Sequence, residues 1–102
     1  MIRIIYRWTV AEGDEEQFIR DWQRGTHLIQ DHCAGAHGSI LVRERKDRRI
    51  FHGIARWESG KAWLAAQPVM AGLKLPGRIP ESADFYDELA VIDPINETTK
   101  KV

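Results

Sequence analysis

The stretch HGSILVRERKDRRIFHGIARW, residues 37–57, decides the fold. Apolar and β-branched residues lie on both sides of a strongly charged centre, a pattern typical of two β-strands joined by a tight turn near Lys46–Arg49. The sequence therefore predicts an antiparallel hairpin. Ser59 follows the second strand at once, and serine is a favoured N-cap, so we expect a helix to begin there.

A strand and a helix are predicted before the hairpin. Residues 2–10 alternate with a period of two, which indicates a strand. One row of that strand consists of Ile2, Ile4, Tyr6, Trp8 and Val10. After Gly13, Asp14 and Gln17 have the spacing of a helix N-cap and capping box. An apolar stripe with the helical period of 3.6 residues then extends to about Cys33.

The segment after the hairpin predicts one more helix and one more strand. Pro68 lies inside the helix that begins after Ser59, and we expect it to kink or split that helix because proline has no N–H group. Residues 73–82 contain two prolines and a glycine and are predicted as a loop. The last strand is predicted over Glu88–Ile92.

The resulting order, β-α-β-β-α-β, predicts an α+β fold of the ferredoxin-like type. We expect one domain over residues 1–95, with a four-stranded antiparallel sheet, two helices on one face, and a polar tail over 96–102. The other face is expected to be partly apolar, because Ile5 and Leu41 fall on the rows opposite their neighbours. We therefore predict a homodimer packed sheet to sheet; the alternative is a monomer with scattered apolar surface residues.

Charge and cysteine content exclude several classes of protein. Lys plus Arg equals Asp plus Glu at fifteen each, so no overall field draws the chain to nucleic acid or to an anionic membrane. The basic segment 43–49 lacks interleaved aromatic residues and is predicted to be a solvated hairpin tip. A single cysteine, Cys33, suits a reducing compartment, and no signal peptide is recognised, so we expect a cytoplasmic protein.

The stretch ARWESGKAW, residues 55–63, resembles the antibiotic biosynthesis monooxygenase family. Members of that family typically end their third strand in Trp-x-Ser, followed by an Ala and an aromatic residue on the next helix. Trp57, Ser59, Ala62 and Trp63 fit this pattern. The resemblance implies the same element order over roughly residues 1–95 and pairing of two chains into a dimeric α/β barrel.

The resemblance also implies a choice of functions. Family members include cofactor-independent oxygenases of aromatic polyketides and quinols, haem-degrading enzymes, and domains without a known activity. The polyketide oxygenases have an Asn where this chain has Gly53 and a Tyr where it has Trp63. The haem-degrading members have an Asn on the first strand and a His on the second helix, and neither is present in this sequence, which disfavours haem degradation.

One row of the third strand predicts a binding cavity. Gly53 and Ala55 are small and stand next to Trp57 on that row, which leaves space between sheet and helices. The residues predicted to bind a substrate there are Trp57, Trp63, Tyr6, Trp8 and Gly53. The alternative is a filled core in which helix side chains such as Trp22 occupy the space.

His52 is the predicted catalytic base, because an unperturbed imidazole titrates at about pH 6.5. Strict alternation places it on the face opposite Trp57, so it reaches the cavity only if Gly53 forms a β-bulge. Otherwise we expect it to face the interior of the dimer or to pair across strands.

These patterns favour a small dimeric oxygenase that acts on an aromatic hydroquinone- or polyketide-type molecule without metal or organic cofactor. His27, His32 and His37 lie five residues apart, which matches no zinc-binding spacing, so no metal site is predicted. The alternative function is a non-catalytic dimeric module of the same fold that binds a small apolar ligand.

Overall fold

The computed structural model describes residues 1–94 of the chain. In chain order the elements are β1 (Ile2–Thr9), α1 (Glu15–His32), β2 (Ala36–Arg43), β3 (Ile50–Trp57), α2 (Gly60–Gly72) and β4 (Ser82–Asp87). This is the predicted β-α-β-β-α-β order. The predicted tail, 96–102, lies outside the described residues. Neither of the two helices within residues 1–94 is long and apolar enough to cross a membrane.

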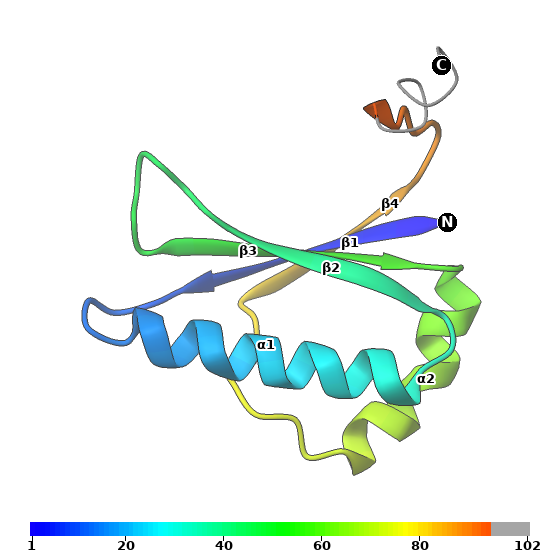
Figure 1. Ribbon diagram of the computed structural model, residues 1–102, viewed down its shortest axis with the longest axis horizontal. Coiled ribbons are helices and arrows are strands. Elements are labelled where there is room, and N and C mark those ends of the chain that lie inside the picture. Colours follow the sequence, from blue (N-terminus) through cyan, green and yellow to red (C-terminus); the bar gives the residue numbers. More distant parts are fainter. Residues whose placement is uncertain (95–102) are drawn as a thin grey trace.

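The four strands form one antiparallel sheet in the order β2-β3-β1-β4. Figure 1 shows α1 and α2 together on one face of this sheet, with the other face uncovered. The predicted fold class is therefore confirmed. The central strands β3 and β1 carry the apolar rows that the helices cover, whereas β2 and β4 are edges.

The helix-facing surface of the sheet is built by matching rows of β1 and β3. In the register of the two strands Ile4 pairs with Ala55 and Trp8 pairs with Phe51, so both predicted rows point to the helices. Ile4 and Phe51 are among the most deeply buried side chains. Phe18 of α1 packs on Phe51 with ring centroids 5.1 Å apart. Burial of these rings holds the helix layer on the sheet.

The two predicted helix N-caps have different outcomes. Ser59 caps α2 as predicted, since its hydroxyl accepts a hydrogen bond from the backbone N–H of Ala62 at 3.0 Å. Asp14 is the N-cap residue of α1 as predicted, but the predicted capping box with Gln17 is absent, since the Gln17 amide bonds Asp21. The Asp14 carboxylate makes no cap bond and instead accepts a hydrogen bond from the distant Arg78 guanidinium at 2.9 Å. The carboxylate thus forms a long-range ion pair in place of the local hydrogen bond to the helix backbone.

Pro68 does not split the second helix, because α2 runs as one element from Gly60 to Gly72. Ala66, before the proline, is buried in the core, and Met70, after it, packs against the same cluster. Tertiary packing on both sides of Pro68 therefore holds together a helix that the local sequence disfavours.

The last strand differs from the prediction: β4 is Ser82–Asp87, not Glu88–Ile92. β4 pairs only with β1, and Asp87 already pairs with Ile2, the first residue of that strand. Only Met1 remains beyond this pair, and its carbonyl accepts a hydrogen bond from the Glu88 N–H at 3.0 Å, so the pairing ends there. The apolar side chains that suggested a strand are exposed instead, Leu89 at 94% and Ile92 at 78%.

Glu88 fixes the end of β4 to the two central strands. Its carboxylate accepts hydrogen bonds from Arg3 Nε at 2.8 Å and from Arg56 Nη2 at 2.6 Å. These two guanidinium groups, Arg56 first, lower the pKa of Glu88 from its ordinary 4.5 to about 2. Arg3 and Arg56 are opposite each other on β1 and β3, so one carboxylate ties three consecutive strands of the sheet together.

Glu88 makes stability depend on acid. A carboxyl whose pKa is lowered in the folded protein stabilises it above the unfolded pKa, and that contribution disappears as the pH falls through the folded pKa. We expect Glu88→Gln to lower the free energy of unfolding at pH 6, and the difference from the unmodified protein to vanish between pH 4.5 and about 2. Urea denaturation across this pH range measures it. A difference that stays constant with pH would show that the carboxylate charge does not contribute.

Candidate functional site

A pocket of about 700 Å³ lies between the helices and the sheet. Its size is within the range of ligand-binding cavities, roughly 300–1,000 Å³. All four tryptophans of the chain line it, together with Tyr6 and Phe18. The space predicted beside Trp57 is therefore present, and the indoles form its walls and do not fill it.

Four of the five predicted binding residues line the pocket. Tyr6 and Trp8 rise from β1, Trp57 closes the end of β3, and Trp63 comes from the first turns of α2. The Trp63 ring meets Phe85 of β4 edge to face, with centroids 4.8 Å apart. The wall is thus assembled from elements at both ends of the chain.

Gly53, the fifth predicted residue, lies underneath the wall. A Cβ atom at this position would stand 3.0 Å from Trp8 Cζ3 and 3.2 Å from Trp22 Nε1, closer than side chains normally approach. The missing side chain therefore allows two indoles to lie directly on β3. Gly53 shapes the pocket by letting Trp8 and Trp22 descend onto the sheet.

Tyr6 brings a hydroxyl group to this aromatic surface. Burial raises the pKa of the Tyr6 phenol above its ordinary value, and a hydrogen bond from the Trp63 indole offsets part of that rise. An indole N–H only donates, so the phenol oxygen of Tyr6 is the acceptor in this bond. The hydrogen of the Tyr6 hydroxyl is then available to a ligand, and the phenol remains a neutral donor at neutral pH.

His52 is not part of the pocket. Pairing of β3 with β1 is continuous from Ile50 to Trp57, so the bulge at Gly53 that would turn the imidazole inward is absent. His52 lies on the uncovered face, with Nε2 3.3 Å from a carboxylate oxygen of Glu44. The structure therefore brings the aromatic residues together and leaves the predicted base on the other side of the sheet.

The loop between α2 and β4 forms a wall that the sequence did not reveal. Six consecutive residues of it, 75–80, line the pocket. The Trp8 indole donates a hydrogen bond to the Arg78 carbonyl at 3.0 Å, and the Arg78 side chain binds Asp14 at the start of α1. These contacts hold the loop across the helix layer, over the aromatic floor.

Gly25 is the sequence signal that could have located this loop. It is buried in the middle of α1, where glycine is normally unfavourable, and a Cβ there would lie 3.3 Å from the Pro76 carbonyl oxygen. The loop therefore lies almost directly on the helix backbone. A helical glycine between apolar positions of this kind marks the close approach of another chain segment.

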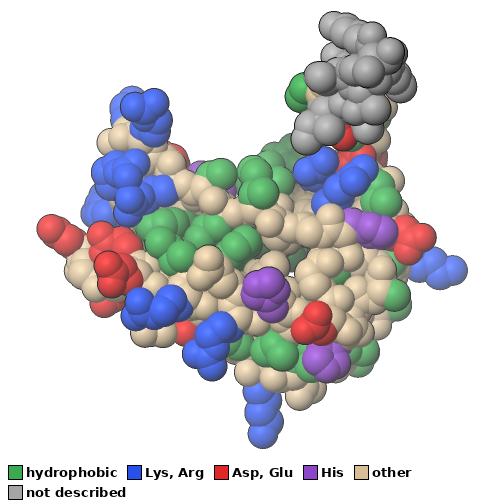
Figure 2. Space-filling model, in the orientation of Figure 1, with side chains coloured by type: hydrophobic (Ala, Val, Ile, Leu, Met, Phe, Trp, Pro, Cys, Tyr) green, Lys and Arg blue, Asp and Glu red, His purple; other side chains and the backbone are tan. Residues whose placement is uncertain are grey.

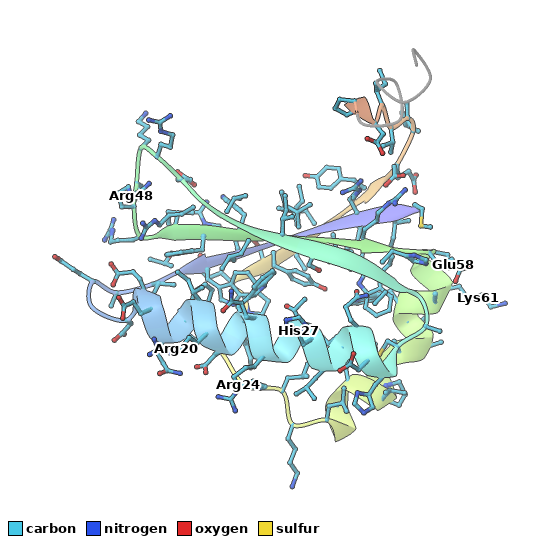
Figure 3. The ribbon with its side chains drawn as sticks, viewed as in Figure 1. Arg20, Arg24, His27, Arg48, Glu58 and Lys61 are labelled. Atoms are coloured by element: carbon cyan, nitrogen blue, oxygen red, sulfur yellow. The ribbon has the colours of Figure 1, made fainter. Side chains whose placement is uncertain are left out.

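No carboxylate and no imidazole lines the pocket among the described residues. His27 lies on α1 but is exposed and outside the pocket, and Arg20 and Arg24 of the same helix extend away from the sheet (Figure 3). Within residues 1–94, no group of three His, Cys, Asp or Glu side chains is arranged to hold a metal ion. The pocket therefore offers aromatic surface and hydrogen-bond donors, and no acid–base pair of side chains.

Residues 1–67 match the model of the family named antibiotic biosynthesis monooxygenase. This segment contains the first three strands, α1 and the start of α2, and with them most of the pocket floor. No sequence among the curated proteins matches the chain.

Solved structures with the same fold cover nearly the whole chain. A putative antibiotic biosynthesis monooxygenase from Bordetella bronchiseptica is 18% identical, with a TM-score of 0.66, 87% of this chain and 97% of that chain covered. SnoaB from Streptomyces nogalater, a cofactor-independent oxygenase solved in a mutant form, is 19% identical, with a TM-score of 0.66, and the match covers 89% of this chain and 95% of that chain. The haem degrader MhuD from Mycobacterium tuberculosis, with two haems in its active site, is 17% identical, with a TM-score of 0.67, and the match covers 90% of this chain and 98% of that chain.

The close approach at Gly25 predicts an unusual response to alanine. Gly→Ala inside a helix normally stabilises a protein by about 0.5–1 kcal/mol. Gly25→Ala is expected to fall short of this gain by about 1 kcal/mol, because the new methyl group pushes the loop off α1. Urea denaturation measures the free energy of unfolding.

Gly72, at the end of α2, is the matched control, since a Cβ there would meet nothing within 4 Å. Gly72→Ala is expected to be neutral or stabilising. Equal gains for Gly72→Ala and Gly25→Ala would mean that the loop does not press on the helix.

Proposed function

The chain belongs to the antibiotic biosynthesis monooxygenase family, and we propose that it is a cofactor-independent monooxygenase acting on an aromatic hydroquinone-, anthrone- or polyketide-type small molecule. The observation that carries this proposal is the partly buried Tyr6 hydroxyl in a pocket whose walls are aromatic. A planar, oxygen-bearing ring system matches both the flat indole surfaces and the single phenolic donor.

The proposed reaction draws its electrons from the substrate. Loss of a proton from an anthrone gives an electron-rich enolate, which transfers one electron to dioxygen, and the two radicals combine to form a carbon–oxygen bond. The O–O bond of the resulting hydroperoxide then breaks as the remaining C–H proton is lost. A CH₂ group becomes a carbonyl, one oxygen atom enters the product, and the other leaves as water, so no external reductant is needed.

Tyr6 is the proposed catalytic donor in this reaction. Its hydroxyl would hydrogen-bond to the substrate oxygen on which negative charge develops, which favours the enolate over the neutral ring. The pocket offers no carboxylate or imidazole to take the substrate proton, so the proton passes to water at the pocket mouth. The substrate's own ionisation then sets the pH dependence of the rate.

Three tryptophans are proposed to bind the small aromatic substrate. Trp8, Trp57 and Trp63 hold the ring by stacking and exclude water from the reacting carbon. We also propose that the protein acts in the cytoplasm, where Cys33 stays reduced. The competing function, a binding module without turnover, keeps the same pocket and differs only in whether dioxygen is consumed.

Oxygen consumption with an anthrone tests the proposal. We expect the unmodified protein to accelerate uptake over the buffer reaction and Tyr6→Phe to lower kcat about 10- to 100-fold, because one donor to the developing oxyanion is lost. Uptake should rise with pH toward the pKa of the anthrone itself.

His52→Ala is the matched comparison, since this residue lies on the far face of the sheet. We expect it to retain kcat within about twofold. A large loss in His52→Ala would restore the imidazole as the base. Uptake at the buffer rate with every protein, together with tight binding of the anthrone, would establish the non-catalytic module instead.

We further propose that a second copy of the chain covers the uncovered face of the sheet. Ile40 and Val42 of β2 are 56% and 40% exposed on this face, and Ile5 and Ile54 of the central strands lie beside them only partly buried. Figure 2 shows hydrophobic side chains gathered next to the basic tip of the β2–β3 turn. An apolar strip on a sheet face is normally covered by another surface.

Sedimentation velocity tests the dimer. At micromolar concentration we expect the unmodified protein to sediment as a dimer and Ile40→Asp as a monomer, because a carboxylate in the strip would be buried without a partner. Leu64→Asp is the control, since Leu64 is 65% exposed on α2, away from this face. A monomer for the unmodified protein would contradict the proposal.

A further inference from the structure

The indole N–H of Trp22 lies over Gly53, at the surface of the sheet. It belongs to α1, is half-buried, and lines the cavity. Its Nε1 atom would lie 3.2 Å from a Cβ at position 53, so the polar edge of the indole points down to the sheet at the one place where β3 has no side chain. Any other residue at Gly53 would displace this N–H group.

The position of Gly53 places the Trp22 N–H near the base of the Tyr6 side chain. Gly53 is the direct cross-strand partner of Tyr6, and such partners have side-chain positions about 5 Å apart. The Trp22 indole, which comes from α1, and the Tyr6 side chain, which comes from β1, therefore reach neighbouring positions on the helix-facing surface of the sheet.

The indole N–H groups in the pocket differ in their partners. The Trp8 N–H donates to the Arg78 carbonyl, and the Trp63 N–H donates to Tyr6. The N–H of Trp57, whose side chain is only 3% exposed, has no acceptor among residues 1–94. Within residues 1–94 the Trp22 N–H has no acceptor, and it is not among the fully enclosed polar atoms without a partner. The Nε1 atom is therefore not fully enclosed, and the Trp22 ring lines both the aromatic pocket and a shallower hollow beside β2.

An open donor of this kind discriminates between ligands. A ring without an oxygen would cover the Trp22 N–H and remove its water, which leaves a polar group unpaired at a cost that a hydrogen-bonding ligand avoids. A site built to donate a hydrogen bond rejects the analogue that lacks the acceptor far better than one built only on shape.

We propose that Trp22 is a ligand-binding residue whose indole N–H donates a hydrogen bond to a carbonyl or phenolate oxygen of the ring system, and that it selects such molecules over hydrocarbons of the same shape. Gly53 is the positioning residue that admits it. This inference rests on the proposed function in one respect, namely that the aromatic pocket is the ligand site. It adds a second donor, from α1, to the Tyr6 hydroxyl.

Two tricyclic probes of one skeleton test the inference: fluorenone, with a carbonyl oxygen, and fluorene, with a CH₂ group in its place. Equilibrium dialysis gives the dissociation constant of each with the unmodified protein and with Trp22→Phe, which keeps an aromatic ring and removes the N–H. We expect Trp22→Phe to weaken fluorenone about 3- to 10-fold and to change fluorene less than twofold, as loss of one hydrogen bond requires.

The outcomes separate this inference from the proposed function. Equal weakening of both probes, or of neither, would overturn the role of the Trp22 N–H and leave the oxygen-uptake experiment unaffected. Failure of the unmodified protein to bind either probe would overturn the pocket as an aromatic site and both proposals with it.

A measurement on the unmodified protein covers the case in which Trp22→Phe does not fold. In a ¹⁵N–¹H spectrum we expect the assigned indole resonance of Trp22 to move downfield on addition of fluorenone, which accepts its hydrogen bond, and not to move downfield with fluorene, which offers no acceptor. An unchanged Trp22 resonance with saturating fluorenone would contradict the proposal.

Discussion

The pairing of β1 with β3 in one register is the constraint on which the rest of the structure depends. Tyr6 lies directly opposite Gly53. On the same face, Ile4 lies opposite Ala55 and Trp8 lies opposite Phe51. A slip by one residue would exchange the faces and send Tyr6 and Trp8 to the uncovered side. The pocket floor, the donor and the space for the indoles are thus consequences of a single alignment. The Glu88 carboxylate, bound to Arg3 and Arg56, fastens that alignment from the opposite face.

How far the sequence predicts this molecule depends on the distance over which each feature is determined. The rows of β1 and β3, the fold and the Ser59 cap follow from local periodicity and capping, and the structure has them as predicted. The errors concern distant partners. The Asp14 carboxylate bonds Arg78 rather than a backbone N–H of α1, and β4 lies where β1 can pair with it rather than where apolar residues are densest. The 75–80 wall was missed for the same reason, because it depends on what packs against Gly25.

Gly53 and Trp22 concern the polar groups at one point of the pocket, above position 53 of β3. The resemblance to the polyketide oxygenases implies an Asn amide at position 53, and glycine there removes a hydrogen-bonding side chain from the sheet. In this chain the vacated volume is occupied by an indole from α1 whose N–H lies close to the same point. In the proposal above, the Trp22 N–H takes the part of the amide that the resemblance implies at position 53.

The sheet separates two kinds of electrostatics, and this separation limits the chemistry. The uncovered face carries ion pairs, Arg7 with Glu81 and Glu88 with Arg3 and Arg56, and the His52 ring lies beside the Glu44 carboxylate. The pocket on the covered face is lined by rings, and also by a neutral phenol, indole N–H groups and the residues Arg56 and Arg78, all of which donate hydrogen bonds and do not exchange protons at neutral pH. A site of this composition does not accept a proton itself, but it stabilises an anion that has already formed. Substrates that ionise readily and reduce dioxygen themselves need no more than this, whereas a reaction that requires a side-chain base would need a different face of the protein.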